Sequence, residues 1–381
     1  MMVDHVPFTD IYIDDTMTER ITEVLRGGRH VKGPINEEFE QQFAAALDSD
    51  HAVTVANGTA ALLLAMKSLG LNEGDDVFVP AHTYFATVSP VLEIGATPRF
   101  VDIDSTRYTM DPESLRNYVD KVENPSAIVV THMHGQPADM DSIIEISHKY
   151  NLPIIEDAAQ AHFAKYRDQR VGSIGDIGCF SFYPTKNMTV GGDGGMITTN
   201  DSELAEHCRA LRNHGRNSSG EHVVLGLNYR LDETSAAIGI EQLKHIQDWS
   251  DGRRHTAELY DRLLADNDSI KTPPNPKDSE PVYHHYAVQV PHGERTAFRT
   301  HLDQWGIDTG VHYDHPVHKQ PAVQDRIDNA EAPVAEQYCQ RTVSLPMHPR
   351  LSDEEVNYVV TAIDNFTHED AGRRNNGGMS S

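Results

Sequence analysis

The sequence predicts an α/β protein with an open sheet in a large domain and a smaller α+β domain after it. Seven short apolar runs, separated by turns or helical segments, each have the length of one buried strand: His51–Val55, Asp76–Pro80, Pro98–Val101, Ser126–Thr131, Pro153–Glu156, Cys179–Tyr183 and Met196–Thr199. Further along, a strand over Val282–Val290, a helix over Glu294–Trp305 and a strand over Thr309–Tyr313 indicate the smaller domain. A chain of 381 residues is long enough for both.

We place the domain boundary where the composition changes. Residues 1–248 are predicted to form the large domain, with an N-terminal segment of residues 1–35, and residues 249–367 the small one. A stiff, turn-rich stretch with three prolines, at 271–276, lies near this change. Residues 368–381 are poor in apolar side chains and are predicted to be disordered.

The chain is strongly acidic. It has 58 acidic against 32 basic residues, which gives a formal net charge of −26. Nucleic acids and anionic membranes bind basic surfaces, so we exclude both as partners. The chain starts without a signal peptide and no run reaches the roughly 18 apolar residues of a membrane helix, so a cytoplasmic protein is expected. Because the acids are scattered and there are only ten lysines, we hypothesise a cytoplasm of high salt, which would screen the self-repulsion.

The cysteines and histidines do not predict a metal site. Three cysteines far apart suit neither a disulfide framework nor a zinc site. His132 and His134 could form a metal or acid–base pair, but polar caps of a strand-end loop are the simpler interpretation. His312, His315 and His318 repeat every three residues, yet an intervening proline breaks helical spacing.

Three side chains that could act together lie at the ends of predicted strands. Asp157 follows one apolar run directly, Ser181 lies in the next, and Lys186 stands on the loop after it. Open α/β sheets bind ligands at the carboxyl ends of their strands. A buried lysine near a carboxylate and phosphate-binding groups suits pyridoxal 5'-phosphate (PLP), because the amine reacts with the aldehyde and the acid keeps the pyridine nitrogen protonated. The spacing alone also fits, and somewhat favours, an exposed loop lysine and a strand-end cap.

A second candidate site follows the first predicted strand. The segment Ala56-Asn57-Gly58-Thr59 leads from that strand into a strongly helical run. The first turn of a helix has free N–H groups and a positive dipole end, which can bind an anion. An ordinary helix cap by Asn57 or Thr59 is equally compatible, and both interpretations can hold together.

The residue sequences of three motifs resemble those of a known family. E-D-A-A-Q-A-H at 156–162, G-D-I-G-C-F-S-F-Y-P-T-K-N at 175–187 and G-D-G-G-M-I at 192–197 are similar to the DegT/DnrJ/EryC1/StrS family of PLP-dependent sugar aminotransferases. The resemblance implies the aspartate-aminotransferase-like fold of type I, with a large, mostly parallel sheet that binds PLP. It is long and ordered along the chain, and the other segments agree with it.

The resemblance also assigns roles to individual residues. Lys186 would form the Schiff base with the cofactor and Asp157 would face its pyridine nitrogen. Gln160 would contact the cofactor hydroxyl, and Tyr84 would stack on the ring. The phosphate would be held by Gly58, Thr59 and Ser181, and by Asn228 of a neighbouring subunit, which implies a homodimer with shared active sites. His312 and Tyr313 would lie near the substrate.

The resemblance implies amino transfer from glutamate to a nucleotide-linked keto sugar. Dehydrating members carry histidine in place of the lysine, so Lys186 favours transamination. A cyclitol or aromatic precursor as substrate stays open, and so does a non-catalytic sensor that binds PLP or a sugar nucleotide. A purely structural protein is compatible with the acidity but not with the ordered motifs. The sequence names neither the sugar, the nucleotide nor the ring carbon.

Overall fold

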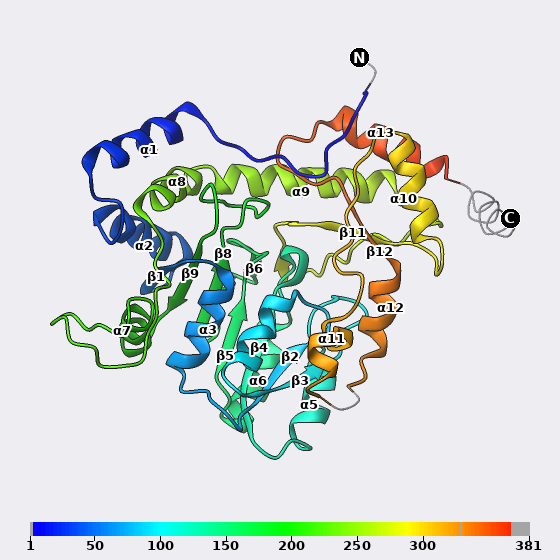
Figure 1. Ribbon diagram of the computed structural model, residues 1–381. Helices are drawn as coiled ribbons and strands as arrows, with labels where there is room; N and C mark the ends of the chain where they lie inside the picture. Colours follow the sequence, from blue (N-terminus) through cyan, green and yellow to red (C-terminus); the bar gives the residue numbers. More distant parts are fainter. Residues whose placement is uncertain (1–2, 328–329, 367–381) are drawn as a thin grey trace, which may run out of the picture.

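The computed structural model of the protein describes residues 3–327 and 330–366, and its centre is a seven-stranded sheet (Figure 1). The strand order is β1-β9-β8-β5-β4-β2-β3, in which β9 is antiparallel to both neighbours and the other strands share one direction. The strands are β1 (His51–Val55), β2 (Asp76–Pro80), β3 (Thr97–Val101), β4 (Pro125–Thr131), β5 (Ile154–Asp157), β8 (Ile177–Ser181) and β9 (Gly195–Thr199). The predicted α/β class with a mostly parallel sheet is confirmed.

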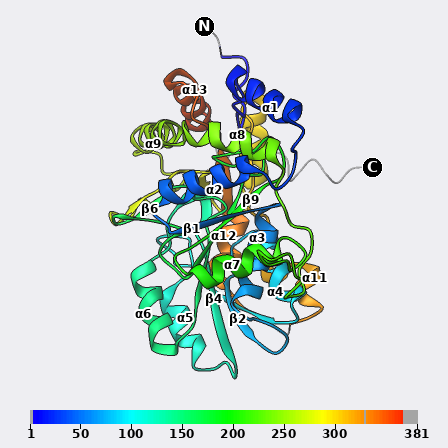
Figure 2. The ribbon, with the colours of Figure 1, turned by 90° about the vertical axis from the view of Figure 1, so that its left-hand side faces the viewer.

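Helices cover both faces of this sheet. Figure 2 shows α5 and α6 on one side and α3, α4 and α7 on the other. The helices of the first 250 residues are α1 (Asp15–Gly27), α2 (Pro34–Leu47), α3 (Gly58–Ser68), the 3₁₀ turn η1 (Phe85–Thr87), α4 (Ser89–Glu93), α5 (Pro112–Val119), η2 (Met133–Gly135), α6 (Met140–Tyr150), α7 (Ser202–Leu211), α8 (Glu233–Leu243) and the start of α9 (Ile246–Leu263). Over the described residues, no helix combines the length and the apolar character needed to span a bilayer.

Alternate residues of each strand enter two different apolar cores. On β4, Ile128 and Val130 pack with α5 and α6, whereas Ala127 and Val129 pack with α3 and α7. All four side chains are fully buried. Because helices cover both faces, the central strands are apolar at nearly every position, as the sequence runs indicated.

The last third of the chain contributes a third apolar core outside the sheet. It joins the two-stranded antiparallel sheet of β11 (Tyr286–Gln289) and β12 (Thr342–Leu345) to α9, α10 (Arg295–Gln304) and α13 (Asp353–Asp364). Val6 of the N-terminal segment is buried in this core. The elements η3 (Val317–Lys319), α11 (Pro321–Gln324) and α12 (Pro333–Arg341) instead contribute residues to the core on the α3 side of the sheet. Three short strands, β6 (Lys165–Tyr166), β7 (Gln169–Arg170) and β10 (Ser279–Glu280), form a separate small sheet.

Two predicted strands differ from the structure. The strand expected over Val282–Val290 is shorter, because residues 282 and 285 turn away and donate their N–H groups to the carbonyls of Gly135 and His134. The strand expected over Thr309–Tyr313 is wrong, because Gly310 forms a single isolated bridge with Ser344 of β12 and the neighbouring residues do not extend it. The predicted disordered tail, 368–381, lies outside the described residues.

Candidate active site

The carboxyl ends of β5 and β8 bring the predicted acid, hydroxyl and amine to one edge of the sheet. The two strands are parallel neighbours, with Asp157 the last residue of β5 and Ser181 the last of β8. Lys186 follows on a loop, where its N–H donates to the Tyr183 carbonyl at 2.8 Å. Adjacent parallel strands end at the same side, so side chains from different motifs meet there.

Asp157 is buried and held by two donors. Thr87 Oγ1 donates to Asp157 Oδ2 at 2.7 Å, and the Ala159 N–H donates to Oδ1 at 3.2 Å. Burial raises the pKa of Asp157, while both hydrogen bonds and the positive charge of Lys186 act in the opposite direction. Each carboxylate oxygen keeps a lone pair for one more donor, such as a protonated ring nitrogen.

Thr87 belongs to a chain of three buried hydroxyl groups. Its oxygen lies 2.7 Å from Thr83 Oγ1, which lies 3.1 Å from Thr131 Oγ1. An ionised Asp157 only accepts, so Thr87 donates to it, Thr83 donates to Thr87 and Thr131 donates to Thr83. All three dipoles therefore stabilise the charged carboxylate, in a surrounding that otherwise disfavours charge.

Lys186 is partly buried near Asp157. Burial lowers the pKa of Lys186 to about 8, although the Asp157 carboxylate acts to raise it. An appreciable fraction of the amine is then uncharged near neutral pH, and the uncharged amine is the form that attacks an aldehyde. The residue therefore differs from the exposed loop lysine that the spacing alone also allowed.

The first turn of α3 lies against the end of β8. Asn57 caps the helix by accepting the Ala60 N–H at 2.8 Å, while the N–H groups of Gly58 and Thr59 have no acceptor within the helix. A Cβ added at Gly58 would lie 2.7 Å from the Cβ of Ser181, so glycine is required for this close approach. The Ser181 hydroxyl and the helix N-terminus together make a cradle suited to a phosphate.

The remaining predicted residues of this chain lie around the same edge. The Tyr84 side chain is 58% exposed, which leaves its ring free to stack on a ligand, and its centroid is 5.5 Å from that of Tyr313. Gln160 Nε2 donates to the Tyr313 hydroxyl at 3.1 Å. His312 lies behind Tyr313, with Nδ1 at 3.0 Å from Ser344 Oγ. Gln160 and Tyr313 are thus directly connected, and His312 supports them.

Asn228 does not join this cluster within one chain. It is exposed on the loop after α7, where its backbone bridges Asn213. Within residues 3–327 and 330–366, no hydrogen bond connects Asn228 with Asp157, Ser181 or Lys186.

The histidines considered for a metal point to different partners. His318 Nε2 lies 3.0 Å from Glu336, and the His312 ring stacks on that of His285 with centroids 3.7 Å apart. In the described part of the chain, no group of three or more His, Cys, Asp or Glu side chains is arranged to hold a metal ion.

The sequence did not reveal a buried carboxylate–histidine hydrogen bond at the residue before Asp157. Glu156 points to the opposite face of β5, is fully buried and lies 2.9 Å from His132 Nε2. It also accepts three backbone N–H groups of the 172–175 loop at 2.6–2.8 Å. The Ala138 N–H donates to His132 Nδ1 at 3.1 Å, so Nδ1 is unprotonated and Nε2 carries the proton. This pair fixes the end of β5 from behind.

One sequence signal could have found this pair, but none pointed to Thr87. A glutamate inside an apolar strand must find a partner, and His132 follows the neighbouring strand. Nothing in the sequence around Thr87 distinguishes it from other threonines, and only the structure shows its hydrogen bond to Asp157.

The chain as a whole is similar to one family of known proteins. The family model of the DegT/DnrJ/EryC1/StrS aminotransferase family matches residues 11–364. The chain belongs to this family. The resemblance drawn from the motifs is thereby confirmed, and the protein is a PLP-dependent aminotransferase of the aspartate-aminotransferase-like fold.

Two curated members and one solved structure illustrate the similarity. The dTDP-3-amino-3,4,6-trideoxy-alpha-D-glucose transaminase of Streptomyces venezuelae is 41% identical over 344 residues, which cover 90% of each chain. The UDP-N-acetyl-3-dehydro-alpha-D-glucosamine 3-aminotransferase of Acidithiobacillus ferrooxidans is 38% identical over 93% of this chain and 94% of its own. The crystal structure of S. venezuelae DesV in complex with a ketimine intermediate covers 97% of this chain and 100% of its own, at 39% identity and a TM-score of 0.91.

The residues of this edge fit the cofactor of the family. The cradle at Gly58 and Ser181 suits its phosphate, the free lone pairs of Asp157 suit a protonated pyridine nitrogen, and the amine of Lys186 can be uncharged. PLP, when bound, supplies an aldehyde for amines and a ring that withdraws electrons from the attached carbon.

Proposed function

We propose that the protein transfers an amino group from glutamate to a nucleotide-linked keto sugar. The observation that carries this is the meeting of Lys186, Asp157 and the anion cradle of α3 at one edge of the sheet. The names of the two similar enzymes support the acceptor class, since one is a dTDP-sugar and the other a UDP-sugar aminotransferase. Glutamate as donor is the expectation drawn from the resemblance.

Each residue would have a defined task. Lys186 would hold the cofactor and, once released by the amino donor, its Nζ would take the proton from Cα of glutamate. A pKa of about 8 suits this work, because the amine can both accept and return a proton near neutral pH. Asp157, oriented by Thr87, would keep the ring nitrogen protonated. Tyr84 would cover one face of the ring, and Gln160 would contact its hydroxyl.

The visible spectrum of the purified protein in high salt tests this proposal. A yellow band that bleaches with glutamate and returns with a nucleotide-linked keto sugar is the expected result. Lys186→Ala should abolish both changes, since the described residues place no other lysine amine at this edge. Lys67→Ala, on α3, is a matched control and should behave as wild type. A protein that PLP cannot colour would overturn the proposal and leave the sensor interpretation.

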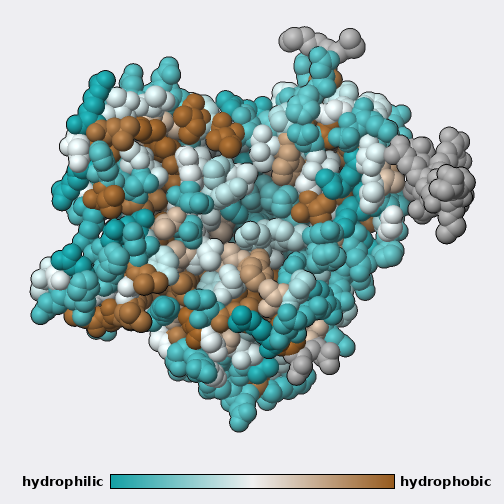
Figure 3. Space-filling view, in the orientation of Figure 1, coloured by the Kyte–Doolittle hydropathy of each residue, from teal (hydrophilic) through white to brown (hydrophobic). Residues whose placement is uncertain are grey.

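We also propose a homodimer in which Asn228 completes the neighbour's phosphate site. Apolar side chains beside Asn228 are open to solvent: Leu225 is 86% exposed, and Val223 and Leu227 are more than half exposed. Figure 3 shows apolar residues gathered over the region of α1, α2 and α7, on the left of that face. A second copy could cover this surface.

Subunit mixing tests the shared site. Lys186→Ala and Asn228→Ala homodimers should each be impaired, but a mixed dimer has one site with an intact Lys186 and an intact partner Asn228. That site should regain activity. Purified mixed dimers without recovery would show that each site is self-contained.

The location and domain division remain proposals. We propose that the protein works in a cytoplasm of high salt, supported by its net charge of −26. The division into residues 1–248 and 249–367 is supported by the third core, which gathers residues of α9, α10 and α13. The contacts of η3, α11 and α12 with the sheet core show that the two parts are packed together.

A further inference from the structure

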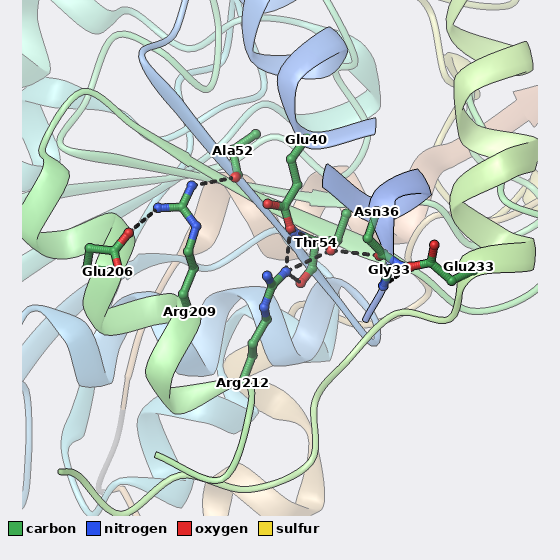
Figure 4. Close-up of polar contacts among 9 residues, drawn as sticks. All are labelled: Gly33, Asn36, Glu40, Ala52, Thr54, Glu206, Arg209, Arg212 and Glu233. Atoms are coloured by element: carbon green, nitrogen blue, oxygen red, sulfur yellow. Dashed lines mark hydrogen bonds and ion pairs between the residues drawn. The ribbon is translucent and has the colours of Figure 1, made fainter. Parts of the chain in front are cut away.

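A single buried carboxylate holds the start of α2 against the start of α8. Glu233, the first residue of α8, is 1% exposed. Its Oε1 accepts the Gly33 N–H at 2.6 Å and the side-chain amide of Asn36 (Figure 4). Its Oε2 accepts the Ile35 N–H at 3.0 Å. All of these donors lie about 200 residues away in the sequence.

Glu233 supplies the cap that α2 lacks. The cap position of α2 is Gly33, which has no side chain to accept the free N–H groups of the first turn. A carboxylate is favoured there because it lies at the positive ends of two helix dipoles, α2 and α8. A Cβ on Gly33 would lie 2.6 Å from Glu233 Oε2, so the fit requires glycine.

The contact extends into a wider polar network. Asn36 Oδ1 lies 3.0 Å from Thr54 Oγ1 on β1. Thr54 also contacts Glu40 and Arg212, and these two form an ion pair at the end of α7 (Figure 4). α2, β1, α7 and α8 are therefore joined by side chains that are buried or nearly so.

This network fixes both ends of the loop that carries Asn228. Before Asn228, the Leu227 N–H donates to the Leu211 carbonyl at 3.1 Å; after it, the Tyr229 N–H donates to the Arg212 carbonyl at 2.9 Å. At the far end, the Glu233 N–H donates to the His30 carbonyl at 2.9 Å. The exposed Asn228 is thus presented by a loop that backbone hydrogen bonds hold to the rest of the fold at both ends.

We propose that Glu233 is a positioning residue whose effect appears in the neighbouring subunit. By tying its loop to α2, it holds Asn228 in place for the partner's cofactor phosphate. The proposal rests on the shared active site of the proposed function. It differs from a purely structural role in where the substitution acts. PLP affinity should fall when Glu233 is replaced in the subunit that lends Asn228, and not when it is replaced in the subunit that holds the cofactor.

Mixed dimers of two designs test this, with cofactor affinity as the readout. In each mixed dimer, one chain carries Lys186→Ala and the other keeps Lys186. Only the site of the second chain then gives the visible band of lysine-bound PLP. In the first design, Glu233→Gln is added to the Lys186→Ala chain, which lends Asn228 to that site. In the second, Glu233→Gln is placed in the other chain, which holds the site. Glutamine keeps the shape, but its NH₂ group would face N–H donors.

The first design should bind PLP about tenfold or more weakly than a Lys186→Ala/wild-type dimer, because loosening one hydrogen bond to a charged phosphate costs at least that factor. The second should bind nearly as well as that reference. Glu241→Gln, which removes another buried carboxylate from α8, is the control. When it replaces Glu233→Gln in either design, the PLP affinity should equal that of the reference dimer. Both designs contain one Glu233→Gln chain, so a general loss of stability would affect them equally.

Equal losses in the two designs, or a loss in the second alone, would overturn the inference. If Glu233→Gln fails to form dimers, Glu233→Asp offers a milder test, since it keeps the charge but shortens the reach. A failed recovery in the Lys186→Ala and Asn228→Ala mixture would instead reject the shared site itself, so the two failures can be told apart.

Discussion

The lowered pKa of Lys186 predicts how fast the cofactor-free protein captures PLP at each pH. Only the uncharged amine attacks the aldehyde, so the capture rate should follow the uncharged fraction of Lys186. With a pKa of about 8, that fraction rises about tenfold per pH unit below pH 8 and then levels off. For a lysine of ordinary pKa, the capture rate would keep rising to about pH 10.

The magnitude follows from the two pKa values. At pH 7, an amine with a pKa of about 8 is uncharged in roughly one molecule in ten. An ordinary lysine, with a pKa of about 10.4, is uncharged in roughly one molecule in 2,500. Burial of Lys186 should therefore accelerate capture at pH 7 by a factor in the low hundreds, before any gain from orientation.

A stopped-flow measurement of the visible band, from about pH 6.5 to 9.5, checks this prediction, with α-N-acetyl-lysine as the unburied reference amine. Asp157→Asn tests the direction in which the Asp157 carboxylate shifts the pKa of Lys186. The Asp157 carboxylate raises the pKa of Lys186, so its removal should move the break in the profile below pH 8. A profile that rises without a break through pH 9.5, or a break that moves upward in Asp157→Asn, would refute the reasoning.

Three further predictions concern the cradle, the acid and the charge. Gly58→Ala should weaken PLP binding at least tenfold, because its Cβ would collide with Ser181, whereas Gly27→Ala, with open space around it, should not; equal affinities would contradict the cradle. Thr87→Val should raise the pKa of Asp157 further and destabilise the fold by about 1–3 kcal/mol, measured by urea unfolding, with Thr87→Ser retaining most of the stability. The melting temperature should rise with KCl from about 0.15 M to above 1 M, where the screening length falls to roughly 3 Å, and a protein most stable in dilute buffer would disprove the high-salt hypothesis.

Local features of the structure could be predicted from the sequence. The first two buried strands have the predicted bounds, and the others differ by a few residues at most, because apolar runs bounded by glycine, proline or acid set their own limits. The capping box of α13, formed by Ser352 and Glu355, is another local feature, since its partners are three residues apart in the sequence. The strand over Thr309–Tyr313 failed because its apolar alternation indicated a strand without telling whether a partner strand lay beside it.

Part of the site could also be predicted, because it depends on strand ends. Asp157 and Ser181 lie at the ends of β5 and β8, and parallel strands necessarily bring their ends together. Tyr84 and Gln160 were assigned through the family resemblance, and the structure places both near Tyr313. Their contacts with the cofactor remain predictions.

The sequence by itself determined which residues could meet, and the tertiary structure decided which of them do. The apolar run placed Asp157 at the end of a strand, but only the packed fold showed that His132 pairs with Glu156 beside it and that Thr87 orients Asp157. Glu233 and Gly33 are 200 positions apart, and no local pattern relates a glycine-capped helix to a distant carboxylate. The physical reason is that local structure follows from backbone and hydrophobic periodicity, whereas a buried polar contact exists only where tertiary packing excludes water from both partners.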